Sequence, residues 1–163
     1  MISLPSILPT RWSRRGRHQQ WFRQITDLEP AMQSRSDAEL SELALSLRYR
    51  ARCREPLAQL LPETYALVRE VARRALNLRP YDVQVSAAMS LFDRSIVEME
   101  TGEGKTLTAA MPMVLHSLAG RGAHLATAND YLARRDAELL GPLYQRLCLQ
   151  VGVIQSELEP PER

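Results

Sequence analysis

The residue with the most specific chemistry in this sequence is its only lysine, Lys105, which stands among twenty arginines. It lies in the run Gly-Glu-Gly-Lys-Thr, which occupies residues 102–106. A compact ammonium on a flexible stem fits between phosphate oxygens, where a planar guanidinium is broader and more rigid. The run is also the core of a phosphate-binding loop, in which the lysine reaches the β- and γ-phosphates and the Thr106 hydroxyl coordinates Mg²⁺. Chance placement of the lysine is the competing explanation.

The elements around this loop are predicted to position it for binding an anion. Residues 95–99 are typical of a short strand, and residues 106–119 are typical of a helix. Three more elements are expected to follow: a strand at 123–127, a helix capped by Asn129 or Asp130 and kinked or restarted at Gly141-Pro142, and a strand at 151–154. This order predicts an α/β P-loop NTPase fold with a partial parallel sheet covered by helices. Backbone N–H groups and the positive end of the helix dipole would then converge on one anion.

The part before the loop is predicted to be helical. A helix over residues 19–28 is expected to end at Pro30, and Ser36 to Glu39 has the spacing of a capping box. Pro62 is expected in the first turn of a later helix that stops at Asn77, and Asp82 is expected to cap another that runs to Phe92. The chain therefore divides into a basic tail at 1–17, a helical extension at 18–79 and a partial nucleotide-binding domain at 80–163.

Composition excludes several classes of protein. The chain is 45% hydrophobic and 25% charged, which is typical of a globular domain. Its net charge of +2 gives no reason to expect general binding to polyanions. Cys53 and Cys148 lie too far apart in sequence for a metal-binding or redox pair, and reduced, inert thiols are expected. No apolar run approaches the roughly 20 residues that a membrane span needs.

The N-terminus is basic and has no acidic residue before Asp27. Five arginines fall in this stretch: Arg11, Arg14, Arg15, Arg17 and Arg23. An organellar transit peptide, a segment that binds an anionic membrane surface and a solvated tail all fit this pattern. In the second case Trp12, Trp21 and Phe22 would be the interfacial anchors.

Three motifs in order resemble the SecA preprotein translocase ATPase family. They are RPYDVQ at residues 79–84, EMETGEGKTLT at 98–108 and TANDYLARRD at 127–136. The resemblance covers about residues 20 to 155. Glu100 stands where the family usually has Arg, and Pro80 where it usually has His. Neither of these two departures touches the residues that cradle phosphate. Met99 takes the place of the first glycine in the general P-loop pattern, a variation that occurs in helicase-like motors.

The resemblance implies a set of site residues and ligands. ATP or ADP with Mg²⁺ would be bound by Gly102, Glu103, Gly104, Lys105 and Thr106, of which Lys105 and Thr106 would be catalytic and Thr106 would hold the metal. Gln84 would read the adenine through its side-chain amide, and Tyr81 would pack beside the base. A structural glutamine that caps its own helix is the alternative for Gln84. Asn129, Asp130 and Arg134 would belong to a segment that couples nucleotide state to a polypeptide clamp, or would simply cap and pair along their helix.

The resemblance also implies partners and a limit on activity. The family acts on preproteins at a membrane channel, from the cytoplasm and peripherally at the inner (plasma) membrane, and no nucleic acid is expected as a partner. The sequence after Lys105 contains no apolar strand that ends in Asp-Glu and no second motor domain, so we expect nucleotide binding without useful turnover. Two other functions remain open: part of a superfamily 2 nucleic-acid helicase, and a non-catalytic nucleotide-binding or regulatory remnant.

Overall fold

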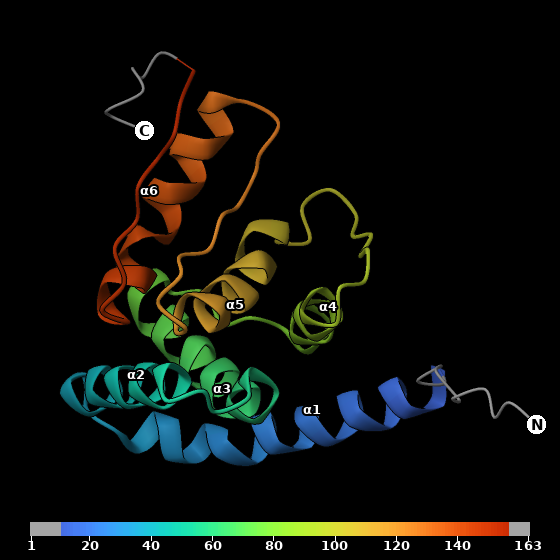
Figure 1. The fold of residues 1–163 in the computed structure, drawn as a ribbon. Helices are drawn as coiled ribbons and strands as arrows, with labels where there is room; N and C mark the ends of the chain where they lie inside the picture. The colour runs from blue at the N-terminus through green and yellow to red at the C-terminus, as the bar shows by residue number, and fades with distance from the viewer. Residues whose placement is uncertain (1–10, 157–163) are drawn as a thin grey trace, which may run out of the picture.

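The computed structural model describes the backbone of residues 11–156 and the side chains of residues 14–156. Within that part the chain forms helices joined by turns and extended segments (Figure 1). The helices are α1 (Arg11–Ser34), α2 (Asp37–Arg52), α3 (Leu57–Leu76), α4 (Asp82–Phe92), α5 (Lys105–Ser117) and α6 (Asp130–Arg146).

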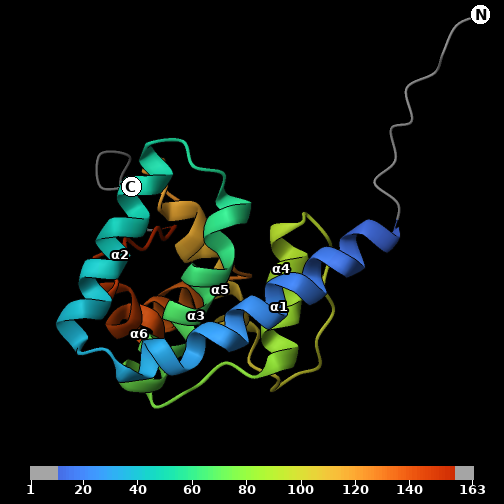
Figure 2. The same ribbon diagram turned by 90° about the horizontal axis from the view of Figure 1, so that it is seen from below.

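Helix α3 is the centre of the molecule. It packs against α1, α2, α5 and α6, and every residue from Leu60 to Ala72 except Glu63 is buried. In the view from below, α1 crosses in front of α3 and continues past α4 (Figure 2). Because a helix surrounded on all sides buries apolar side chains around its whole circumference, the core of this molecule is built on α3.

Three of the helix caps that the sequence predicts are present, but Asp82 is not a cap, because Tyr81 is the N-cap of α4 and Asp82 is its first residue. The Ser36 hydroxyl accepts a hydrogen bond from the Glu39 N–H, and the Glu39 carboxylate accepts one from the Ser36 N–H at 2.7 Å. Asn77 ends α3 with φ at +55°, a left-handed conformation that asparagine tolerates. Asn129 caps α6, where its Oδ1 accepts a hydrogen bond from the Leu132 N–H at 2.9 Å.

Two helix boundaries predicted from proline were wrong. Helix α1 continues through Pro30 to Ser34, and α3 begins at Leu57, so Pro62 lies inside it and not in its first turn. Both prolines are followed by residues that the core buries, Met32 in α1 and Tyr65 in α3. Packing of these side chains offsets the backbone hydrogen bond that proline removes. At the third predicted break, Gly141-Pro142, α6 is likewise continuous.

The predicted α/β parallel sheet was also wrong, because the part of the chain that the structure describes contains no strand. Residues 95–99, 123–127 and 151–154 are extended but form no sheet hydrogen bonds with one another. The last two segments run along α6 and line a shared cavity of about 310 Å³ (Figure 1). Apolar side chains on all three are exposed, such as Ile96, Leu125 and Ile154. A parallel strand is stable when it is paired and covered on both faces, and these short segments have neither condition met.

The basic N-terminal stretch is partly accounted for by α1. Residues 1–10 and the side chains of Arg11 and Trp12 lie outside the described residues. Trp21 is only 6% exposed and packs edge-on against Phe92, so it is not placed as an interfacial anchor. Arg17 forms an ion pair with Asp93 at 2.7 Å. Among the helices of the described residues, none is long and apolar enough to cross a membrane.

Candidate nucleotide-binding site

The predicted phosphate loop was residues 102–106. In the structure, residues 101–104 join the extended segment after α4 to α5, and Lys105 and Thr106 are the first two residues of that helix. Gly102 and Gly104 have φ angles of +92° and +77°, which glycine adopts without the steric cost that a Cβ would bring. Gly104 is the N-cap of α5 and offers no side chain to bond the first N–H groups of the helix. These donors, together with the positive end of the helix dipole, are therefore available to an anion.

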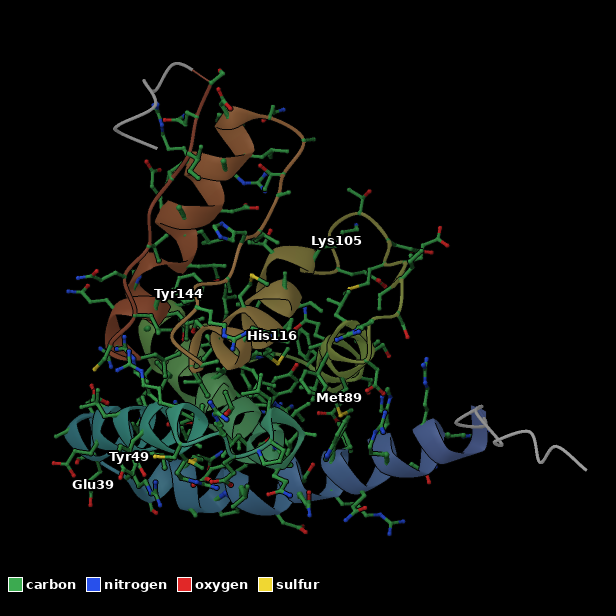
Figure 3. All side chains as sticks on the ribbon, in the orientation of Figure 1. Glu39, Tyr49, Met89, Lys105, His116 and Tyr144 are labelled. Atoms are coloured by element: carbon green, nitrogen blue, oxygen red, sulfur yellow. The ribbon has the colours of Figure 1, made fainter. Side chains whose placement is uncertain are left out.

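Lys105 is the first residue of α5 and is exposed, at the end of the helix that faces away from α1 (Figure 3). Its ammonium donates a hydrogen bond to the Glu100 carbonyl at 2.6 Å. The Glu103 carboxylate accepts a hydrogen bond from the Glu100 N–H at 3.0 Å. The side chains of the loop thus close it on itself, and Lys105 has only one main-chain contact to exchange for phosphate oxygens.

Gln84 links α4 to this loop. It is 5% exposed, and its Nε2 donates to the Glu103 carbonyl at 2.7 Å while its Oε1 accepts from the Tyr81 N–H at 2.8 Å. A Cβ added to Gly104 would lie 2.4 Å from Nε2 of Gln84, so the glycine is required for this close approach. The residue has the helix-capping role that the sequence left open as an alternative. An amide has two N–H donors and two acceptor lone pairs, so one donor and one acceptor remain for a ligand.

Tyr81 and Thr106 differ in exposure. Tyr81 is the N-cap of α4 and is 70% exposed, so its ring is free to meet a ligand. Thr106 is half-buried, and its hydroxyl donates to Oδ1 of Asp136 on α6 at 3.4 Å. The structure therefore brings Gln84, Glu103, Gly104, Lys105 and Thr106 to the start of α5. Gly102 faces open space, because a Cβ added to it would meet no atom within 4 Å.

Asp136 is a residue of this site that the sequence analysis did not single out. Its side chain is 12% exposed and forms an ion pair with Arg135 at 2.6 Å. Burial raises the pKa of the nearby Tyr144 to about 12, and the Asp136 carboxylate adds to that rise. Asp136 is the last residue of TANDYLARRD, the third motif that resembles the SecA family, and its place in that motif was the signal by which the sequence could have identified it. The contact with Thr106 spans thirty positions, which no local pattern reveals.

The donors near Thr106 fit a magnesium ion shared with phosphates. Mg²⁺ prefers hard oxygen ligands and is usually held by one or two protein groups plus waters and nucleotide oxygens. The Thr106 hydroxyl and the Asp136 carboxylate are such ligands, 3.4 Å apart. Among the described residues, no group of three His, Cys, Asp or Glu side chains could form an all-protein metal site.

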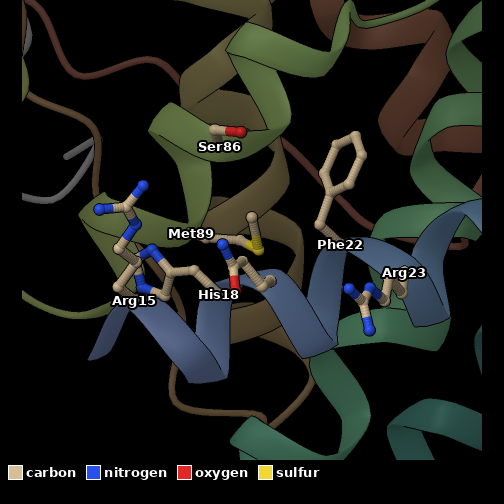
Figure 4. Close-up of a pocket in the computed structure, with 7 residues that line it drawn as sticks. Arg15, His18, Phe22, Arg23, Ser86 and Met89 are labelled. Atoms are coloured by element: carbon tan, nitrogen blue, oxygen red, sulfur yellow. The ribbon is translucent and has the colours of Figure 1, made fainter. Parts of the chain in front are cut away.

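A second hollow lies between α1 and α4, away from the loop. Its volume is about 560 Å³, and Arg15, Arg23 and His18 surround the apolar side chains of Phe22 and Met89 (Figure 4). None of the loop residues lines it. Asp93 is bonded to His18, which lines this hollow. Burial raises the pKa of Asp93, but hydrogen bonds from Arg17 and His18 outweigh this effect and hold the pKa below its ordinary value. These bonds fix the first turns of α1 against the end of α4.

Comparison with known proteins identifies relatives of nearly the whole chain. Residues 6–163 match the family model of the SecA DEAD-like domain. Protein translocase subunit SecA 2 of Rhodopirellula baltica is 50% identical over 160 residues, which cover 94% of this chain and 24% of that protein. Protein translocase subunit SecA of Rubrobacter xylanophilus is 51% identical over 145 residues, which cover 89% of this chain and 16% of that protein. The chain thus spans about a quarter or less of the length of these relatives.

Proposed function

The chain belongs to the SecA family, and from that premise we propose that it is the nucleotide-binding portion of a motor that uses ATP to move proteins across a membrane. The observation that carries the proposal is the start of α5. An uncapped helix end, two glycines with positive φ and an exposed lysine meet there. This combination suits a polyphosphate, because N–H groups and a mobile ammonium both bind phosphate oxygens.

The proposed roles follow from what each side chain can still bond. Lys105 exchanges the Glu100 carbonyl for β- and γ-phosphate oxygens. Gln84 keeps its bonds to Tyr81 and Glu103 and uses its remaining donor and acceptor for the N6 and N7 edge of adenine. The exposed Tyr81 ring packs beside the base.

Magnesium would be held by the Thr106 hydroxyl with the Asp136 carboxylate beside it, and it would neutralise charge on the phosphates. The Thr106 hydroxyl donates a hydrogen bond to Asp136, so Asp136 sets the direction in which the hydroxyl oxygen points. We propose that Lys105 and Thr106 are catalytic residues in the complete motor, because they would contact the phosphates and the metal.

Transport of preproteins through a membrane channel is the activity we propose for the complete protein, which acts from the cytoplasm and binds the membrane peripherally. The relatives named above are protein translocases, which supports this function and does not favour the nucleic-acid helicase alternative. For residues 1–163 alone we propose nucleotide binding without useful turnover. Ground-state contacts to phosphates do not accelerate hydrolysis unless other groups act on the transition state.

Replacing Lys105 tests the proposal. Lys105→Ala removes charge-assisted hydrogen bonds worth about 1.5–3 kcal/mol, so Mg-ADP should bind about ten- to hundred-fold more weakly by calorimetry. Lys105→Arg should also bind poorly if the shape of the cation matters. Arg121→Ala, which removes an exposed cation at a distant turn, is the matched control and should bind as the parent does.

Two outcomes would contradict the proposal. Equal affinity of the parent and Lys105→Ala would remove the loop from the binding site. Steady phosphate release from ATP by the parent, abolished in Lys105→Ala, would show that the chain has a complete hydrolytic centre and would overturn the second half of the proposal.

A further inference from the structure

Arg69 is a charged side chain in the interior of the molecule. It lies in the middle of α3 and is 1% exposed. Its guanidinium contacts three separate elements. Nη1 forms an ion pair with Glu29 of α1, Nε donates to the Pro80 carbonyl at 3.1 Å, and Nη2 donates to Asp82 at 2.7 Å. A buried cation is costly unless it is paired, so the surrounding chain is held where these acceptors stay in place.

Two of the three acceptors of Arg69 flank the N-cap of α4. Pro80 precedes Tyr81, the N-cap of α4, and Asp82 is the first residue of the helix. Arg79 adds a second ion pair to Glu29 at 2.7 Å. The segment 79–82 is therefore held by contacts with both α3 and α1, and its position does not depend on its own turn alone.

The clamped segment is joined to the phosphate loop by two hydrogen bonds. The Tyr81 N–H donates to Oε1 of Gln84, and Nε2 of Gln84 donates to the Glu103 carbonyl. Gln84 also lies against Gly104, where a Cβ would meet it at 2.4 Å. A shift of the N-cap would rotate this amide, and the loop would lose the only side-chain contact that holds its Glu103 carbonyl among the described residues.

We propose that Arg69 is a positioning residue for the nucleotide loop, which acts through Pro80, Asp82 and Gln84 and also couples α1 to the loop through Glu29. The proposal rests on the nucleotide-binding function proposed above. It deepens that function, because it makes the loop geometry depend on a contact between the helical extension and α4. Since coupling is reciprocal, nucleotide at the loop and the position of α1 each bias the other.

The experiment measures the loop both with and without nucleotide, in the full 163-residue chain. Arg69→Met keeps the buried volume and removes the charge. We expect faster amide hydrogen exchange at residues 101–106 without nucleotide, and Mg-ADP affinity lowered roughly three- to thirty-fold, as for residues that act through others. Asp82→Asn, whose side chain is 68% exposed, is expected to shift both readouts in the same direction by less. It decides the question if Arg69→Met does not fold.

Two further variants separate positioning from general stability. Arg73→Gln breaks an ion pair to the buried Glu70 on the same helix, and among the described residues the bonds of Arg73 go to Glu70 and not to the segment 79–84 or the loop. It should lower the unfolding midpoint and leave exchange at 101–106 and nucleotide affinity unchanged. In a Gln84→Ala background, Arg69→Met should cause no further change in either readout, because the link through which Arg69 acts is already gone.

The outcomes distinguish this inference from the function on which it rests. Unchanged exchange at 101–106 in folded Arg69→Met and Asp82→Asn would overturn the positioning role even if nucleotide binds. An effect of Arg69→Met that persists at full size in the Gln84→Ala background would overturn it as well. Faster exchange at 101–106 in Arg69→Met and Asp82→Asn than in the parent, with no Mg-ADP binding by any of the three, would support the positioning role and reject the nucleotide site.

Discussion

The helical region from α1 to α3 and the region after α4 differ in how they satisfy backbone hydrogen bonds and bury apolar side chains. In the first, backbone hydrogen bonds are made within each helix, and side chains such as Leu61 and Tyr65 are fully buried. In the second, α5 and α6 have packed faces, but the segment before α5 leaves Ile96 fully exposed and the segment between α5 and α6 leaves Leu125 44% exposed. Helices satisfy their main chain locally, whereas strands need neighbours. The first region therefore satisfies its main chain within its own helices, whereas the extended segments of the second leave apolar side chains exposed.

The largest expected difference between the regions is the response to losing one aliphatic side chain. Leu61→Ala removes a side chain from the core on α3 and should lower the free energy of unfolding by about 2–5 kcal/mol. Ile96→Ala, in the extended segment before the loop, should change it by less than about 0.5 kcal/mol. Urea unfolding followed by circular dichroism measures both. Similar losses for the two variants would mean that residues 95–99 are packed in solution and that the two regions do not differ.

The same contrast explains what the sequence could and could not predict. The capping box at Ser36, the stop at Asn77 and the helix from Asp82 to Phe92 were correct because each depends on residues within one turn or one helix face. The helix end expected at Pro30 and the helix start expected at Pro62 were wrong, since distant core contacts outweigh a local proline cost.

The strands failed for a different reason. Their pattern of apolar residues is present, but pairing depends on neighbouring strands, and among the described residues those segments do not pair. At the candidate site the loop glycines and Lys105 were found from spacing alone, and their roles stay predictions. Asp136 and Arg69 were missed because their importance comes from contacts across the fold, thirty positions to Thr106 in one case and three separate elements in the other.

An effect of intermediate size on the free energy of unfolding is expected from the ion pairs of Glu70 in α3. Glu70 is 4% exposed, and hydrogen bonds from Arg73 and then Arg74 outweigh burial and hold its pKa below the ordinary value of 4.5. A lowered pKa stabilises the fold above pH 4.5, and that contribution is lost as the pH falls through the folded-state pKa. Glu70→Gln should therefore cost about 1.5–3 kcal/mol at pH 7, and the gap between variant and parent should narrow at lower pH.

The control for this titration is Glu42→Gln, an exposed acid on α2. Urea unfolding at several pH values between 3 and 7 should give a nearly constant, small difference between this variant and the parent. A gap for Glu70→Gln that stays constant down to the lowest pH would mean that the carboxylate is not the group whose charge stabilises α3.

The smallest expected effect compares the same device in the two regions, a side-chain cap at the start of a helix. Ser36 caps α2, whose buried face runs from Leu40 to Ala51, so Ser36→Ala should lower the free energy of unfolding by about 1 kcal/mol. Asn129 caps α6, but the buried residues of that helix, Leu140 and Leu143, come only in its second half. Loss of the Asn129 cap can be absorbed by fraying of the first turns while the packed half remains in place. Asn129→Ala should therefore change global stability by less than about 0.5 kcal/mol and instead speed amide exchange near residues 131–135. Equal losses in urea for the two variants would show that α6 unfolds as one piece with α3.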